Sequence, residues 1–219
     1  MGIFRQTGRV IGILFIWVII ATVGCQSETA APEQDALQPW SNQYYFDFEP
    51  GQEFSFNLKE NSSRGSYEGW FTLTILEEAE ELYTYEYSMM WDEDESISGT
   101  VTCAPIDSFG QLMVSFMRAD SEAVPAVENT IMNDDFMLAT FLPWEAGEKW
   151  SDTSDYGTYV YEVTGPDKFA GVSGLSVQLS IDDVLQFKAT LAAEVPLPLY
   201  IYHRDRIGEY EAILAEYNH

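Results

Sequence analysis

Apolar and polar side chains alternate in short stretches through most of the chain after position 40. The stretch Leu82–Trp91 shows this pattern most clearly, with Thr84, Glu86 and Ser88 on one side of the expected strand. The other side carries large apolar residues, namely Tyr83, Tyr85, Tyr87, Met89 and Trp91. A period of two places alternate residues on one face of a strand, whereas a helix would scatter them. Leu82–Trp91 is therefore predicted to be a strand with one aromatic face.

Further stretches have the same strand-like composition and are separated by Gly, Pro, Asn or Asp. They are Trp70–Glu77, Ile97–Cys103, Gln111–Met117, Gly157–Thr164, Leu175–Ile181, Leu185–Leu191, Leu199–His203 and Glu209–Glu216. Glu78–Glu81 is expected to close a hairpin, with a helix over Leu76–Leu82 as the alternative because Glu and Ala favour helices. Asp182 and Asp183 are expected at the bend of another hairpin.

Short strands at even spacing indicate a mainly β protein rather than a parallel α/β fold. The interval Ala119–Trp150 is less regular, and Asp135–Leu142 is expected to be a strand or a short helix lying over the sheet. The expected fold class is an antiparallel meander that forms a curved sheet, half-barrel or barrel, with or without one short helix across it. Residues 40–219 are expected to form a single domain, since they are too few for two sizeable ones.

A different pattern occupies the N-terminus. Arg5 and Arg9 are followed by an almost wholly apolar run, Val10–Val23, and then by Gly24 and Cys25. This is the architecture of a secretory leader that ends at a lipidation site. The run is shorter than the about 20 residues that span a bilayer, and no positive flank follows it. An uncleaved anchor and an ordinary cleaved signal peptide are the alternatives.

The stretch Thr22–Cys25 resembles the lipobox of bacterial lipoproteins, which reads roughly Leu-Ala-Gly-Cys, although Thr22 stands where Leu is usual. The resemblance implies that residues 1–24 are removed and that Cys25 becomes an acylated N-terminus, with palmitate among its acyl chains. Two or more chains would hold the protein stably in a membrane. Gln26, in place of Asp, favours the outer membrane by the sorting rule known for enteric bacteria. The expected location is therefore the bacterial cell envelope, on the periplasmic or the surface side.

Composition supports a tether followed by an acidic domain. Gln26–Pro39 is rich in Ala, Glu, Gln and Pro and has no apolar period, so residues 25–39 are expected to be the lipidated cysteine and a flexible linker. The chain has 36 acidic and 10 basic residues, a net charge of −26. This charge argues against binding to nucleic acid or to anionic headgroups. It indicates solubility or a saline habitat, with a surface for cations or a cationic partner as the alternative.

Motifs that would carry chemistry are weak or missing in the sequence. Cys103 has no partner for a disulfide once Cys25 is acylated, and it is expected to be a buried thiol. The acidic run Asp92–Ser96 lacks the glycine and the terminal glutamate of an EF-hand loop and is expected to be a solvated hairpin tip, with weak surface binding of calcium as the alternative. Gly171–Gly174 does not have the Gly-x-Ser-x-Gly spacing of a serine nucleophile. No catalytic residue, metal ligand or cofactor is predicted.

The second half of the sequence carries a further resemblance. Leu142–Trp150 has the order Leu-Pro, spacer, Gly-x-x-Trp, and Val195–Tyr200 has the order x-Pro-Leu-Pro. The segment Leu142–Tyr217 thereby resembles DUF3108-like exported proteins and, more distantly, the half-barrel of the lipoprotein carriers LolA and LolB. The residues with an implied structural role are Gly147 and Gly174 at turns, and Pro196 and Pro198 at an edge strand or its approach.

The aromatic residues provide the candidate binding site. Most of them are expected to be core residues and cross-strand pairs. If the sheet curls into an incomplete barrel, Tyr83, Tyr85, Tyr87 and Trp91 would line a face able to hold a hydrophobic ligand. The favoured hypothesis is a lipid-anchored envelope protein with a non-enzymatic β-domain that binds a partner or such a ligand. The alternative is a membrane-anchored hydrolase of cell-wall or extracellular polymer, so whether the chain is an enzyme is left open.

Overall fold

The structure, a computed structural model, describes residues 48–79, 82–91, 95–118, 126–127, 129–131 and 145–219. These ranges contain ten strands, the short 3₁₀ helix η2 (Pro105–Asp107) and the helix α1 (Ser108–Arg118). The strands are β1 (Glu53–Ser62), β2 (Gly65–Ala79), β3 (Leu82–Trp91), β4 (Glu95–Cys103), β5 (Lys149–Ser154), β6 (Gly157–Phe169), β7 (Val172–Ile181), β8 (Val184–Leu191), β9 (Tyr200–Arg204) and β10 (Gly208–Asn218). None of the helices in the described part is long and apolar enough to cross a bilayer.

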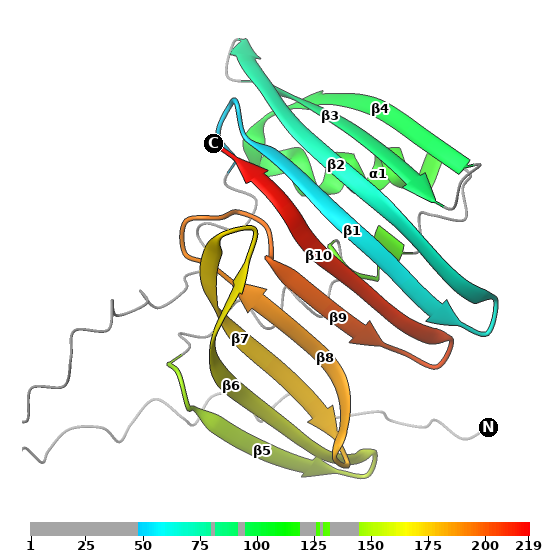
Figure 1. Ribbon diagram of the computed structural model, residues 1–219, viewed down its shortest axis with the longest axis vertical. Coiled ribbons are helices and arrows are strands. Elements are labelled where there is room, and N and C mark those ends of the chain that lie inside the picture. The colour runs from blue at the N-terminus through cyan, green and yellow to red at the C-terminus, as the bar shows by residue number, and fades with distance from the viewer. Residues whose placement is uncertain (1–47, 80–81, 92–94, 119–125, 128, 132–144) are drawn as a thin grey trace, which may run out of the picture. The chain divides into compact units, whose positions relative to one another are not determined.

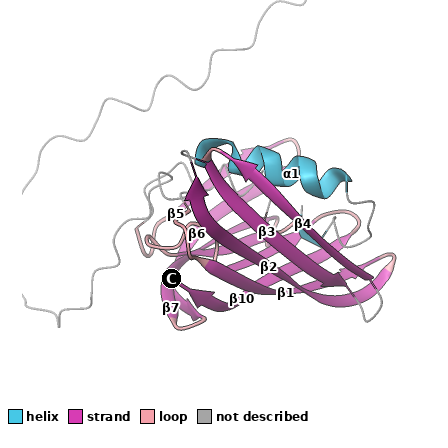
Figure 2. Cartoon of the chain, turned by 90° about the horizontal axis from the view of Figure 1, so that it is seen from above, coloured by secondary structure: helices cyan, strands magenta, loops and turns pink. Residues whose placement is uncertain are grey.

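All ten strands pair antiparallel in one sheet, with the order β4-β3-β2-β1-β10-β9-β8-β7-β6-β5 (Figure 1). Two meanders, β1–β4 and β5–β10, are joined where β1 pairs with β10 along its whole length. The sheet curves without closing, and β4 and β5 are its edges (Figure 2). The predicted mainly β, antiparallel fold is therefore confirmed, as an open curved sheet rather than a barrel.

One face of the sheet packs against α1 and is called the helix face; the opposite one is called the outer face. Alternate residues of the first meander are buried on the helix face, among them Phe54, Phe56, Phe71, Leu73 and Ile75. Strand register places a second buried cluster on the same face of the second meander: Val163, Leu175, Val177, Phe187, Ala189, Leu191 and Ile201. The main hydrophobic core thus lies along one side of the sheet, as period-two patterning requires.

Most of the predicted strands are confirmed, and β2 and β3 pair as the predicted hairpin, with Ala79 opposite Leu82. The alternative helix over Leu76–Leu82 is therefore wrong. The bend at Asp182 and Asp183 is also confirmed, because both have positive φ, 50° and 64°. Asp182 joins this bend to β6 by accepting a hydrogen bond from the amide of Thr158, at 2.9 Å.

The prediction of a strand at Gln111–Met117 is wrong, because these residues belong to α1. Leu112, Val114 and Phe116 are apolar at alternate positions and would share one face of a strand, but Leu112 and Phe116 are fully buried whereas Val114 is 41% exposed. This burial is helical, because residues four apart share the face of α1 that meets the sheet while the residue between them points away from it. The strands β1 and β5 were not among the predicted stretches.

The structural motifs of the second half are partly as expected. Gly147, with φ of 88°, lies at a turn, and buried Pro196 and Pro198 lie in the connection that approaches β9. The expected turn at Gly174 is wrong, since this residue is inside β7. A Cβ there would lie 2.4 Å from the carbonyl oxygen of Leu191, so the glycine allows β7 and β8 to approach closely.

Several predictions concern residues outside the described ranges. They include the leader and Cys25, the linker to residue 39, the possible element at Asp135–Leu142, and Leu142–Trp144 of the Leu-Pro motif. Of the acidic run, residues 92–94 also lie outside, between the end of β3 and the start of β4.

Candidate binding face beneath helix α1

The predicted aromatic residues of β3 all lie on the helix face. Tyr85, Tyr87 and Trp91 are 0%, 3% and 2% exposed, whereas Tyr83 is half-buried. The register partners of Tyr85 and Tyr87 on β2 are likewise apolar core residues, Ile75 and Leu73 respectively. The structure therefore brings the four side chains together on one strand face, in the arrangement that the alternating pattern predicts.

Tyr87 joins the sheet to α1. Its hydroxyl is hydrogen-bonded to that of Ser115, at 2.7 Å, and its ring meets the Phe116 ring edge-on with 4.7 Å between centroids. On its other side, the Tyr87 ring lies against Gly99 of β4, where a Cβ would come within 2.4 Å of the hydroxyl. Phe116 also packs edge-on against Phe71, at 5.8 Å. Tyr87 thus covers the glycine of β4 and holds α1 in place.

Sequence reasoning missed the contribution of α1 to this face. Ser115 and Phe116 were assigned to a strand, so their contacts with Tyr87 could not be anticipated. The signal that could have found them is the helical spacing of Phe109, Leu112, Met113 and Phe116, at i, i+3, i+4 and i+7.

Tyr85 and Cys103 are polar groups at the same face. Burial raises the pKa of Tyr85 to about 12, while the nearby hydroxyl of Ser108 acts in the opposite direction. The hydroxyls of Tyr85 and Ser108 are both buried and make no hydrogen bond of ordinary geometry among the described residues. Burial, and secondarily the charge of Asp107, raises the pKa of the Cys103 thiol. The prediction that Cys103 is a buried thiol is confirmed.

Trp91 fills the far end of the face. Its ring stacks on that of Tyr67 with 6.1 Å between centroids, and its side chain lies against Gly69, where a Cβ would be 2.7 Å away. The protein's own side chains therefore pack against Tyr85, Tyr87 and Trp91. Ligand binding by these residues stays a prediction, and it would require α1 or its neighbours to move.

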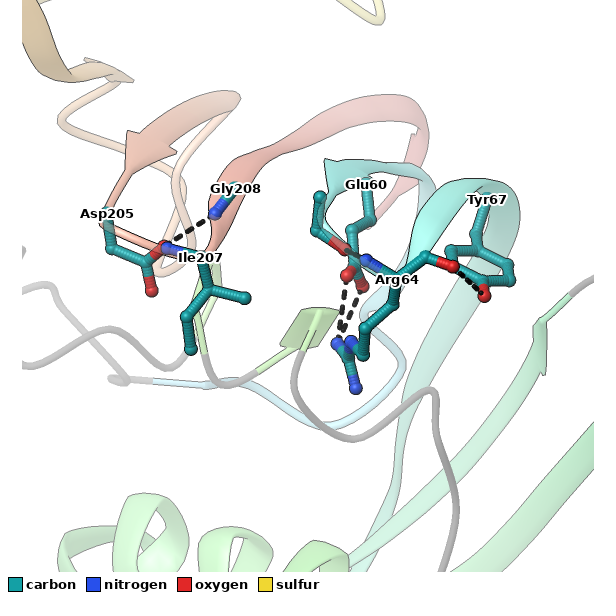
Figure 3. A network of polar contacts seen from close by, with 7 residues as sticks. Glu60, Arg64, Tyr67, Asp205, Ile207 and Gly208 are labelled. Carbon is teal, nitrogen blue, oxygen red and sulfur yellow. Dashed lines mark hydrogen bonds and ion pairs between the residues drawn. The ribbon is translucent and has the colours of Figure 1, made fainter.

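A buried ion pair lies where the β1–β2 and β9–β10 turns meet (Figure 3). Glu60 is fully buried and accepts two hydrogen bonds from the Arg64 guanidinium, at 2.9 and 3.1 Å. The hydrogen bond with Glu60 is the main reason that the pKa of Arg64 is raised. The two turns are also joined directly, because the Ser63 amide donates to the Ile207 carbonyl at 3.0 Å. The Glu60–Arg64 pair thus lies within the β1–β2 hairpin, and the backbone hydrogen bond joins the turn of this hairpin to the β9–β10 turn.

The outer face carries paired charges. Two lysines each meet an acid on the neighbouring strand, Lys59 and Glu68 at 3.5 Å and Lys149 and Glu162 at 3.1 Å. Lys188 of β8 meets Asp167 of β6 across the intervening β7, at 3.4 Å. An open depression of about 320 Å³ lies beside the first pair and is also lined by Asn57, Glu211 and Ile213. These lining groups include charges of both signs, so the depression is not a hydrophobic pocket.

No metal centre can be assembled from the described residues, which contain no group of three or more His, Cys, Asp and Glu side chains with suitable placement. Acidic side chains are instead engaged with Lys or Arg, as for Glu60 and Glu162, hydrogen-bonded to a tyrosine hydroxyl, as for Glu211, or exposed, as for Glu86.

Comparison with models of protein families and with curated protein sequences gives no match. Several solved structures have a similar arrangement. A Bacteroides fragilis protein described as exported, with a YmcC-like fold, has 8% identity and a TM-score of 0.36, covering 84% of this chain and all of that one. A protein of Parabacteroides distasonis described as a lipoprotein has 9% identity and a TM-score of 0.30, with the same coverage.

MucB of Pseudomonas aeruginosa, solved in complex with MucA, is also similar in fold, with 10% identity and a TM-score of 0.38. The match covers 80% of this chain and 54% of that one. With identities of 8 to 10% and TM-scores of 0.30 to 0.38, the function of this chain has to be argued from its own residues.

Proposed function

We propose that the protein is held in a bacterial envelope membrane by acyl chains on Cys25 and that its β-domain is a non-enzymatic binding module. The tether is supported by the leader, by the Gly-Cys pair at its end and by the polar linker that follows. Gln26 after the cysteine favours the outer membrane. The acidic domain gains no attraction from anionic headgroups, so the lipid alone would provide the anchorage.

The observation that carries the binding role is the aromatic helix face. Tyr83, half-buried, lies on this face beside buried Tyr85 and Tyr87, and α1 packs on it through Tyr87 and Phe116. The outer side of α1 keeps an apolar side chain in solvent, since Val114 is 41% exposed. Large aromatic residues and exposed apolar groups next to them are typical of surfaces that bind protein or lipid.

The partner or hydrophobic ligand is expected to dock beside α1, where Tyr83 and Val114 are accessible. Tyr85, Tyr87 and Trp91 would come into contact with it only if α1 shifted, because the chain itself covers them now. A macromolecular partner is favoured over a small ligand, since these core side chains already pack against one another.

Photo-cross-linking in intact bacterial cells tests this function. Benzoylphenylalanine in place of Val114 should give a discrete adduct, whereas the same group in place of Tyr156 should not, although Tyr156 is 86% exposed in the β5–β6 turn. Mass spectrometry of the adduct would distinguish a protein from a lipid. Absence of an adduct at Val114, or equal labelling at both positions, would contradict the proposal.

A further inference from the structure

Within the part of the chain that the structure describes, the strand β4 is an edge of the sheet that lacks the usual protection. Among the described residues it pairs with β3 and with no other strand, and it is nine residues long. It contains no Pro, Lys or Arg, and its pairing with β3 runs from Tyr83 opposite Cys103 to Trp91 opposite Glu95 without a bulge. A long, regular and unguarded edge presents free backbone groups that can pair with another strand.

The other edge is built differently. β5 has six residues, two of which, Lys149 and Asp152, are charged, and all but Trp150 are exposed. Short length and charged side chains are common ways of preventing strand addition. The contrast singles out β4 as the edge at which an additional strand can form.

The side chains of β4 suit an added strand on both faces. Ser96, Ser98, Thr100 and Thr102 present small exposed hydroxyl side chains on the outer face. On the helix face, Ile97 and Val101 are only partly buried against the core, and the helix that contacts β4 exposes Val114. Apolar residues at alternate positions of an added strand would cover Ile97 and Val101.

Charge indicates what the added strand should be. Glu86, exposed on the outer face, is the register partner of Thr100, Glu95 begins β4, and Asp107 is exposed just after it. A second copy of this chain would bring together two molecules with a net charge of −26 each, which repel one another. A segment rich in Lys or Arg would instead be attracted.

We propose that β4 takes up an extended, cationic segment of a partner protein as an additional antiparallel strand. This inference rests on the proposed function and specifies its partner. Backbone hydrogen bonds to β4 supply the affinity, alternate apolar side chains contact Ile97 and Val101, and basic side chains lie on the outer face, on the side of Glu86.

The test uses the full chain in detergent and a labelled, capped peptide of about ten residues that alternates lysine and valine. Two N-methylated forms keep its charge and block hydrogen bonding from opposite edges, one methylated at the lysines and the other at the valines. Fluorescence anisotropy should show that one form binds about tenfold or more weakly than the parent peptide while the other binds like it. Equal binding by both methylated forms would overturn the proposal, since attraction by charge alone does not distinguish them.

Proline substitutions in the chain locate the site. Successive amide groups of a strand point to opposite sides, so either Thr100→Pro or Val101→Pro removes a donor from the free edge and keeps the pairing with β3. The substitution that keeps the pairing with β3 should give the higher melting temperature of the two, and this comparison identifies the residue whose amide faces the free edge. That variant should bind the peptide about tenfold more weakly than the original protein. Ser151→Pro and Asp152→Pro in β5 are the matched controls and should leave binding unchanged.

The outcomes separate this inference from the proposed function. A native partner whose cross-link at Val114 survives the β4 proline substitution would contradict the edge assignment and leave the binding function standing. A dimer of the full chain that the same substitution abolishes would also contradict it, because a second copy would then be the occupant of β4.

Discussion

Glu60 shows how one residue can depart from the pattern of its strand and still be accommodated. It follows Phe54, Phe56 and Leu58 on the helix face of β1 and is 0% exposed. An ionised carboxylate in that position requires a partner, and Arg64 provides it from the adjoining turn. The sequence contains a signal for this role, because Glu60 occupies the next alternate position after Phe54, Phe56 and Leu58 and therefore lies on the same buried face.

Removing one member of this pair should have unequal effects. Arg64→Met leaves the Glu60 carboxylate buried without its partner and should lower the free energy of unfolding by about 2–3 kcal/mol. Glu60→Gln should cost about 1 kcal/mol or less, because the Arg64 side chain is 40% exposed and can be hydrated. Urea unfolding of both variants measures the difference. Equal decreases in the free energy of unfolding would contradict the interpretation that Glu60 is the buried residue and needs Arg64 as its partner.

Tyr85 should make stability fall at high pH. Its pKa is raised by burial to about 12, so above pH 10 the unfolded chain loses this proton while the folded protein retains it. Stability from this group is complete below pH 10 and decreases by up to about 1.4 kcal/mol per pH unit until about pH 12.

The Tyr85→Phe variant isolates this contribution. Its stability should be close to that of the original protein at pH 7 and should decline less steeply between pH 10 and 12. Denaturant unfolding at successive pH values gives the two slopes. Parallel curves would show that Tyr85 ionises at the same pH in the folded and unfolded chains.

At the level of elements, alternation predicted strands well where one face is apolar and the other polar. β3 is the clear case, since its prediction matches the observed bounds, Leu82–Trp91. β5 could not be recognised, because in KWSDTS only Trp150 is even partly buried and the strand is defined by pairing with β6. α1 was misassigned because Leu112, Val114 and Phe116 are apolar at alternate positions, as in a strand, whereas tertiary packing buries Leu112 and Phe116 and decides for a helix.

The docking of α1 should depend on Phe116. Its ring is fully buried between Phe71 and Tyr87, so Phe116→Ala should leave a cavity and lower the free energy of unfolding by about 3–4 kcal/mol. Val114→Ala on the same helix should change it by about 0.5 kcal/mol or less, since that side chain is 41% exposed. Thermal and urea unfolding would compare them. Similar, small effects would mean that α1 is not held on the sheet by this contact.

At the scale of the molecule, period-two patterning indicated the class of fold but not its connectivity. Consecutive hairpins follow from short turns, whereas the pairing of β1 with β10 joins residues far apart in sequence and has no local signal. The aromatic side chains on the helix face of β3 were predicted from the sequence of β3 alone. The packing of α1 over them was not predicted, because the sequence of Ser108–Arg118 is compatible with either a strand or a helix.

Charge and patterning together favour an anchored binding protein. The net charge of −26 disfavours nucleic acid and anionic lipid surfaces, and it makes a cationic partner more favourable than self-association. The chain has 36 acidic and only 10 basic residues, and three of its lysines already pair with acids on the outer face. Most of the acidic side chains therefore have no basic side chain of this protein to balance their charge. The acidity is therefore consistent with the partner expected at β4.

Mass spectrometry of the N-terminal peptide, from protein purified from bacterial membranes, is the decisive test of a β-domain tethered through Cys25. We expect a peptide that begins at Cys25 and carries acyl chains, and a Cys25→Ser variant that loses both the acylation and the membrane association. An N-terminal peptide that still contains residues 1–24, or an unacylated Cys25 in membrane-bound protein, would contradict it.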